Sequence, residues 1–159
     1  MPDAITPPRP IEILLVEDSP SDAFIIKGAL NHSNSSDKIH IVDNGVDAVD
    51  FLRGTGAFSS EARPELILLD LNIPRKDGRE VLQEIKADHR LRKIPVVVFT
   101  SSKADEDVEK CYDLHANCYI TKPVEFKRLS EVLRYVREFW FNIVTLPRQS
   151  QIGLPAGPE

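Results

Sequence analysis

Five short apolar runs, each followed by a stretch with apolar residues at helical spacing, constrain the fold of this chain more than any other feature. Short apolar runs bounded by turn residues indicate strands, and apolar residues recurring at i, i+3 and i+4 indicate helices. The predicted strands are residues 11–16, 38–42, 66–69, 95–100 and 118–121, and the predicted helices cover about 20–31, 46–52, 79–88, 104–114 and 125 onward. This alternation predicts an α/β fold with a parallel sheet, right-handed crossovers and helices on both faces.

The second predicted strand, Lys38–Val42, differs from the other four. It alternates polar and apolar residues, as a strand near the edge of a sheet does, whereas the other four read as buried. This contrast favours a five-stranded, flavodoxin-like sheet with strand order 2-1-3-4-5. In that order the first and third strands flank the point where open α/β sheets bind their ligands.

Length and composition predict a single domain with loose ends. In the 159 residues we expect a disordered, proline-rich arm over 1–10, a folded domain with a long last helix over 11–144, and a tail over 145–159. The net charge of −5 argues against a nucleic-acid partner, and no apolar run approaches the roughly 20 residues of a membrane span. Two cysteines without a paired framework, and no signal peptide, predict a cytoplasmic protein. Because only about fifteen residues follow the last helix, we expect the output to be a protein contact.

Polar residues stand where the four buried strands end. Glu17 and Asp18 follow the first, Asp70 follows the third, Thr100 ends the fourth and Lys122 follows the fifth. Carboxyl ends of parallel strands share one edge of a sheet, so three carboxylates are expected to gather there. Two like charges 4 Å apart repel by about 4 kcal/mol at an effective dielectric of 20, so such a cluster needs a cation. Hard oxygen ligands favour Mg²⁺ as the cofactor, with Lys122 as a partial counterion.

This set of side chains predicts phosphoryl transfer. Asp70 is the expected nucleophile, which attacks phosphorus and becomes an aspartyl phosphate. Lys122 is expected to bind one phosphoryl oxygen, and the hydroxyl of Thr100 can reach another. The expected metal ligands are Glu17, Asp18, Asp70 and the backbone carbonyl of Asn72.

Each of these residues also has an ordinary structural interpretation. Glu17 and Asp18 can cap the helix that follows them, because acids favour a helix N-terminus. Asp70 can be a turn residue ahead of Pro74, and Lys122 can be a solvated surface charge. Only their coincidence at four strand ends favours the functional interpretation.

Four motifs in this order resemble the receiver domain of a two-component response regulator, over about Ile11 to Phe139. They are VEDSP, LILLDLNIP with the following KDG, VVVFTSS and YITKP. The resemblance implies that a sensor histidine kinase donates the phosphoryl group from a phosphohistidine to Asp70. It also implies that the chain catalyses its own phosphorylation and dephosphorylation, as a signalling switch rather than an enzyme with turnover.

The same resemblance implies several finer features. Thr100 and Tyr119 would form the switch, with the Tyr119 ring turning inward on phosphorylation. The bond between Lys122 and Pro123 would be cis, and the kinase would dock around the first helix, which carries Phe24 and Ile25. As an aromatic residue in a strand, Tyr119 can equally be part of the core.

Two longer segments narrow the resemblance. The loop RGTGAFSSEARP and the ending FWFNIVTLP are similar to those of single-domain response regulators paired with cyanobacterial phytochrome histidine kinases. We therefore expect a phytochrome-type sensor kinase as the partner. Two other functions stay open: a phosphorylation-independent interaction module, and a metal-dependent phosphatase. Metal-dependent phosphatases with an aspartyl nucleophile have a second aspartate two residues after the first, and this chain has Asn72 at that position.

The end of the last helix predicts self-association. FWFNIVTL is densely apolar and would be an exposed patch on a monomer. We expect a homodimer that uses Phe139, Trp140, Phe141 and Ile143. The alternative is that this segment folds back on its own domain.

Overall fold

The chain folds into one parallel sheet with helices on both faces. The structure, a computed structural model, describes residues 10–31, 37–58 and 63–147. Most of the predicted arm over 1–10, and the tail beyond 147, lie outside the described residues. The sheet order is β2-β1-β3-β4-β5 and all neighbouring strands are parallel, which confirms the predicted α/β fold with order 2-1-3-4-5.

The elements follow the predicted alternation within a residue or two. The strands are β1 (Glu12–Val16), β2 (Lys38–Val42), β3 (Leu66–Leu69), β4 (Val96–Thr100) and β5 (Cys118–Thr121). The helices are α1 (Pro20–Leu30), α2 (Gly45–Arg53), α3 (Gly78–Ala87), α4 (Asp105–Asp113) and α5 (Phe126–Glu138). Two shorter segments are the 3₁₀ turn η1 (Gly56–Phe58) and the π-helical segment η2 (Phe139–Ile143), which continues α5.

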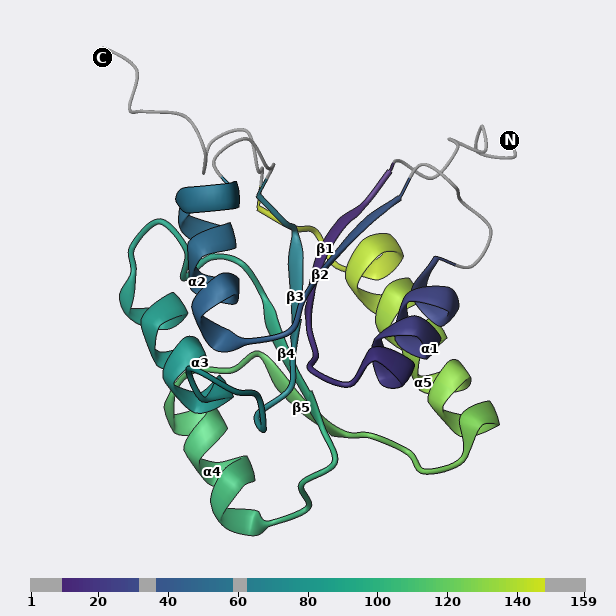
Figure 1. Ribbon diagram of the computed structural model, residues 1–159. Coiled ribbons are helices and arrows are strands. Elements are labelled where there is room, and N and C mark those ends of the chain that lie inside the picture. The colour runs from purple at the N-terminus through teal and green to yellow at the C-terminus, as the bar shows by residue number, and fades with distance from the viewer. Residues whose placement is uncertain (1–9, 32–36, 59–62, 148–159) are drawn as a thin grey trace.

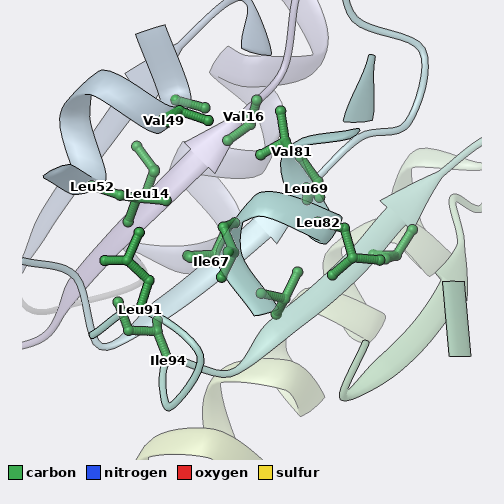
Figure 2. Packing of buried hydrophobic residues seen from close by; sticks show 14 of the residues in the cluster. Leu14, Val16, Val49, Leu52, Ile67, Leu69, Val81, Leu82, Leu91 and Ile94 are labelled. Carbon is green, nitrogen blue, oxygen red and sulfur yellow. The ribbon is translucent and has the colours of Figure 1, made fainter. Parts of the chain in front are cut away.

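Alternate residues of the central strands supply two hydrophobic cores. Figure 1 shows α2, α3 and α4 on one face of the sheet, and α1 and α5 on the other. The core on the α2–α4 side, seen in Figure 2, contains the strand residues Leu14, Val16, Ile67 and Leu69. The core on the α1–α5 side contains the intervening residues Ile13, Leu15, Leu66 and Leu68. Burial on both faces explains why these strands read as continuous apolar runs.

The fifth strand is more exposed than its apolar sequence predicts. All four residues of β5 are only half-buried, whereas those of β4 are fully buried. The expectation that the fifth strand is buried like the first, third and fourth is therefore wrong. The physical reason is its position, because β5 is an edge strand and pairs with β4 alone.

Polar caps fix where the helices begin. Ser19 caps α1 by accepting a hydrogen bond from the Asp22 amide, with Pro20 as the first helical residue, as predicted. Asn44 and Asp77 cap α2 and α3 in the same way. These caps bring helix N-termini to the edge of the sheet where the strands end. Within the described residues, no helix combines the length and the apolar character needed to cross a membrane.

Candidate active site

Three carboxylates meet where β1 and β3 end side by side. Val16 pairs with Leu69, and the Asp70 amide donates to the Val16 carbonyl at 3.1 Å, so the residues after the two strands are neighbours. Glu17, Asp18 and Asp70 each offer one carboxylate oxygen, and these oxygens lie within 4.8 Å of one another. Glu17 and Asp70 are buried, while Asp18 is exposed. The structure thus brings together the three acids assigned to one site from the sequence.

Lys122 closes this pocket from the end of β5. Its amide donates to the Thr100 carbonyl at 2.7 Å, which ties it to the end of β4. Its ammonium forms an ion pair with Glu17 and lies 3.0 Å from Asp70 Oδ2 and 3.4 Å from Asp22 Oδ2. The side chain is 9% exposed, so Lys122 is part of the pocket and is not a solvated surface charge.

The peptide bond between Lys122 and Pro123 is trans, so the expected cis bond is wrong. Trans is the lower-energy isomer even before proline, by about 0.5–1 kcal/mol. Lys122 contacts Glu17 and Asp70 with the bond in that isomer.

Burial and ion pairing act in opposite directions on the charged groups of the pocket. Burial raises the pKa of Glu17 above its ordinary value of 4.5, in spite of the hydrogen bond from Lys122. Burial alone would lower the pKa of Lys122, but its hydrogen bond to Glu17 and the charge of Asp70 outweigh it, and that pKa is raised above 10.5. Lys122 is therefore an ammonium at neutral pH.

The pocket holds more negative than positive charge. In the part of the chain that the structure describes, the one ammonium of Lys122 faces four carboxylates, those of Glu17, Asp18, Asp22 and Asp70. A cluster of hard oxygen donors with uncompensated charge fits a divalent cation of the Mg²⁺ class.

The turn after β3 holds Asp70 by close backbone packing. The Asn72 amide donates to Asp70 Oδ1 at 3.3 Å, and the Gly78 amide donates to the Leu71 carbonyl at 2.9 Å. A Cβ atom at Gly78 would collide with the Asp70 carbonyl oxygen and with the Leu71 backbone. The start of α3 therefore lies directly on the turn that carries Asp70, and only glycine permits that approach.

The two predicted switch residues lie on either side of the β4–α4 loop. Thr100 is fully buried at the end of β4, and its Oγ1 has no hydrogen-bond partner among the described residues. Tyr119 is half-buried on β5, and its hydroxyl donates to the Ser102 carbonyl at 2.9 Å. Burial raises the pKa of Tyr119, so the hydroxyl remains a donor at neutral pH. Thr100 thus has a free hydroxyl, whereas the hydroxyl of Tyr119 is already engaged.

The geometry of this pocket agrees with a comparison against protein families. A model of the response regulator receiver domain matches residues 13–134. The chain belongs to the response regulator receiver family.

Proteins similar to this receiver include a cyanobacterial phytochrome response regulator. Response regulator Rcp1 of Synechocystis sp. is 45% identical over 147 residues, which are 92% of this chain and 99% of Rcp1. The crystal structure of the phosphorylated cyanobacterial phytochrome response regulator RcpA has a TM-score of 0.85 and 44% identity, covering 88% of this chain and 100% of RcpA. The Mn²⁺-bound form of Rcp1 has a TM-score of 0.83 and 45% identity, covering 87% and 100%. These matches confirm the predicted resemblance.

A charged network that the sequence analysis missed joins α3 to α4 in this receiver. Arg79 donates to Asp107 Oδ1 through Nε at 3.0 Å and Nη2 at 2.5 Å, and to both oxygens of Asp77 through Nη1 at 3.1 Å. Ser102 Oγ donates to the other Asp107 oxygen at 2.6 Å. The hydrogen bond from Ser102, and then that from Arg79, lower the pKa of Asp107. These four residues are called the α3–α4 network below.

Asp22 is a second residue near the pocket that the sequence analysis missed. It lies four residues after Asp18, in the first turn of α1, and was not assigned to the pocket from the sequence. Residues four apart on a helix share a face, and Asp18 stands just before this helix, so the spacing was a usable signal. The structure shows its carboxylate beside the Lys122 ammonium, 45% exposed.

The apolar segment at the end of α5 divides into two sets of residues. Trp140 and Phe141 pack against the α1–α5 core of the receiver. Phe139 and Ile143 are 45% and 66% exposed, and Tyr135 on the preceding turn is 57% exposed. Trp140 and Phe141 therefore fold back on their own domain, whereas Phe139 and Ile143 belong to an exposed stripe.

Proposed function

We propose that this receiver is a phosphorelay response regulator in which a sensor histidine kinase transfers a phosphoryl group from a phosphohistidine to Asp70. The observation that carries the proposal is the buried Asp70 carboxylate, which shares one pocket with Lys122 and with two further acids. Membership of the receiver family supports it. The alternative, an interaction module that never takes phosphate, has no use for a buried pocket with uncompensated charge.

The metal assigned to this pocket is Mg²⁺. Its ligands would be Glu17, Asp18, Asp70 and the backbone carbonyl of Asn72, and the three carboxylate oxygens are close enough to share one ion. The relative Rcp1 has been crystallised in a Mn²⁺-bound form, which supports a divalent ion in the acidic pocket. When bound, the ion neutralises charge on the phosphoryl oxygens.

The residues of the chain divide the transfer among them. An oxygen of Asp70 attacks phosphorus, the bond between phosphorus and the imidazole nitrogen breaks with its electron pair leaving on nitrogen, and an acyl phosphate forms. The Lys122 ammonium exchanges a carboxylate for a phosphoryl oxygen. Thr100 Oγ1, which is unpartnered among the described residues, donates to another phosphoryl oxygen. The Tyr119 hydroxyl is hydrogen-bonded to the loop that follows Thr100, so a movement of Thr100 would also displace the Tyr119 side chain on β5.

Incubation with acetyl phosphate and Mg²⁺, followed by intact-mass measurement, tests this function. We expect wild type to gain one phosphoryl group and Asp70→Asn to gain none. Asp113→Asn, which changes an exposed acid on α4, serves as the matched control and should behave as wild type. No gain by wild type supports the interaction module, and steady hydrolysis of small phosphoesters supports a phosphatase.

The partner kinase is proposed to be of phytochrome type, because the similar protein RcpA is a cyanobacterial phytochrome response regulator. Phosphotransfer from a phosphorylated phytochrome histidine kinase should be about tenfold or more faster than from a kinase of another sensor class. Asp70→Asn is the control for transfer to this site. Equal rates from both kinases would contradict the assignment without affecting the phosphoacceptor role.

A homodimer is proposed to form through the exposed stripe Tyr135, Phe139 and Ile143. These side chains recur every four residues, so they form one apolar ridge along the end of α5 and η2. Trp140 and Phe141 support the ridge from the core side.

Light scattering on size-exclusion fractions tests the dimer. Phe139→Asp and Ile143→Asp should shift wild-type dimer to monomer, because a charge in the ridge opposes its burial. Phe24→Asp, an equally drastic change at an exposed phenylalanine on α1, should leave the mass unchanged. A monomeric wild type in both the free and phosphorylated states would contradict the dimer.

A further inference from the structure

A hollow of about 580 Å³ lies at the end of the sheet opposite Asp70. Its walls come from the last turn of α2, from Arg63 shortly before β3, and from the end of α3 with the loop that leads to β4. These segments precede the strands, so they gather at the amino edge of the sheet. The residues that matter for its chemistry are Arg53, Arg63, Asp88, His89 and Arg90.

Counted over the described lining residues, positive charge exceeds negative charge in this hollow. Asp88 is the one lining carboxylate without an ammonium partner: its Oδ1 accepts from the Arg90 amide at 2.8 Å, and its Oδ2 lies 3.9 Å from Arg53 Nε. The other lining carboxylate, Glu84, is already bound to Lys76 at 2.5 Å. Among the residues that the structure describes, the three guanidinium groups of the hollow therefore share a single available carboxylate.

Arg63 is the guanidinium of this set with a donor shielded from solvent. Its Nη1 is shielded from solvent and has no hydrogen-bond partner in the part of the chain that the structure describes. Burial, and then the neighbouring charge of Arg90, lower the pKa of Arg63, although a guanidinium stays protonated. Buried donors are nearly always paired in native proteins, so a shielded N–H beside a second guanidinium needs an acceptor.

We propose that this hollow binds a small anion with at least two negative charges, of the phosphate or polycarboxylate class. Guanidinium forks bind such oxygens in pairs, with charge-assisted hydrogen bonds. An anion would give Arg63 Nη1 the acceptor it lacks and would separate the charges of Arg63 and Arg90. The volume falls within the range of small-ligand sites. The inference does not depend on phosphorylation of Asp70, because the two sites occupy opposite edges of the sheet.

Titration of the full-length protein, followed by amide chemical shifts, tests the site. Pyrophosphate and citrate are added separately, at constant ionic strength and without divalent metal, so that the acidic pocket does not contribute. We expect saturable shifts at Arg53, Arg63 and residues 88–91. A response to pyrophosphate alone assigns the phosphate class, and a response to citrate alone assigns the polycarboxylate class. No saturable response to either anion, or shifts confined to the acidic pocket, would overturn the proposal.

Arginine variants separate this site from general attraction of anions. Arg63→Gln and Arg90→Gln should each weaken binding by about tenfold or more, the loss expected for a charge-assisted contact. Arg128→Gln removes the same charge from an exposed arginine of α5 and should bind as wild type. Equal weakening in all three variants would overturn the site. Arg90→Gln changes an exposed side chain, so its melting temperature without anion should not fall, which distinguishes lost binding from lost folding.

Discussion

Two charged clusters lie along the same edge of the sheet, and they differ in how their charges are balanced. In the acidic pocket, one ammonium faces the four carboxylates named above, and Thr100 Oγ1 has no partner among the described residues. In the α3–α4 network, Arg79 lies between Asp77 and Asp107, and Ser102 completes the second carboxylate. The first cluster is left open to an additional cation and an additional acceptor, whereas in the second every guanidinium nitrogen is hydrogen-bonded to a carboxylate.

This difference shows which cluster serves binding and which serves stability. The guanidinium nitrogens of the network already have carboxylate partners, so we expect the network to hold α4 against α3 rather than to bind a ligand. A pocket with uncompensated charge is less stable by itself and becomes more stable when its ligand arrives. Changes in the pocket should therefore alter chemistry most, and changes in the network should alter stability.

Removal of the ammonium from the pocket should have the largest effect. We expect Lys122→Met to slow phosphorylation of Asp70 by about 10²–10³-fold, as for other preorganised donors that stabilise a transition state. Arg79→Met removes a cation from the network and should leave the rate within about threefold of wild type. Rates with acetyl phosphate and Mg²⁺ measure both, with Lys110→Met on the exposed face of α4 as the control. A comparable loss in Arg79→Met would remove the distinction between the clusters.

Removal of a metal ligand should have the next largest effect. In wild type, Mg²⁺ at ten times its Kd should raise the free energy of unfolding by about 1.4 kcal/mol, or roughly 4 °C in Tm. Asp18→Asn should lose most of this increase, and without metal its Tm should not fall, because a like charge has left the cluster. Thermal denaturation with and without Mg²⁺ measures the effect, and Asp113→Asn is the matched control. An unchanged Mg²⁺ response in Asp18→Asn would exclude Asp18 as a ligand.

The α3–α4 network should make a contribution to the free energy of unfolding that is lost at low pH. The pKa of Asp107 is lowered from its ordinary value of 3.8, so its ionised form is favoured in the folded state. The contribution is complete above pH 3.8 and is lost as the pH falls through the lower pKa of the folded protein. We expect Asp107→Asn to be less stable than wild type by about 1–3 kcal/mol at neutral pH.

Urea denaturation of both proteins at several pH values measures this prediction. Groups that titrate in both proteins, including those of the acidic pocket, cancel in the difference. The gap in free energy of unfolding between wild type and Asp107→Asn should be constant above pH 3.8 and should narrow below it. A gap that widens in acid would contradict the direction of the pKa shift.

The fold was predictable because its determinants are local. Each central strand is an apolar run, Ser19 and Pro20 indicate the start of α1, and the alternating pattern of β2 indicates a strand at the edge of the sheet. The burial of β5 was predicted wrongly, because the short run CYIT does not reveal that the strand has only one neighbour. Edge position is a property of the whole sheet, and the sequence of β5 lacks the polar–apolar alternation that marks β2 as an edge strand.

The acidic pocket could be predicted from the sequence, whereas the α3–α4 network could not. Glu17, Asp70 and Lys122 could be placed together because parallel strands end on one edge of the sheet. Arg79 and Asp107 are 28 residues apart, on two helices whose contact depends on loop geometry, and no periodicity links them. The close approach of Gly78 to the Asp70 backbone likewise appears only once the chain is folded.

The smallest expected effect lies where the two clusters join. The Tyr119 hydroxyl donates to the carbonyl of Ser102, whose side chain belongs to the α3–α4 network and whose loop follows Thr100. Tyr119→Phe removes this single hydrogen bond and retains the half-buried ring, so stability should fall by about 0.5–1.5 kcal/mol. Phosphorylation of Asp70 should proceed as in wild type, because the hydroxyl contacts the loop and not the carboxylates. Urea midpoints measure the loss, with Asp113→Asn at an exposed position of α4 as the control. A loss of phosphorylation in Tyr119→Phe would show that the network and the pocket act as one unit, and the comparison between them would fail.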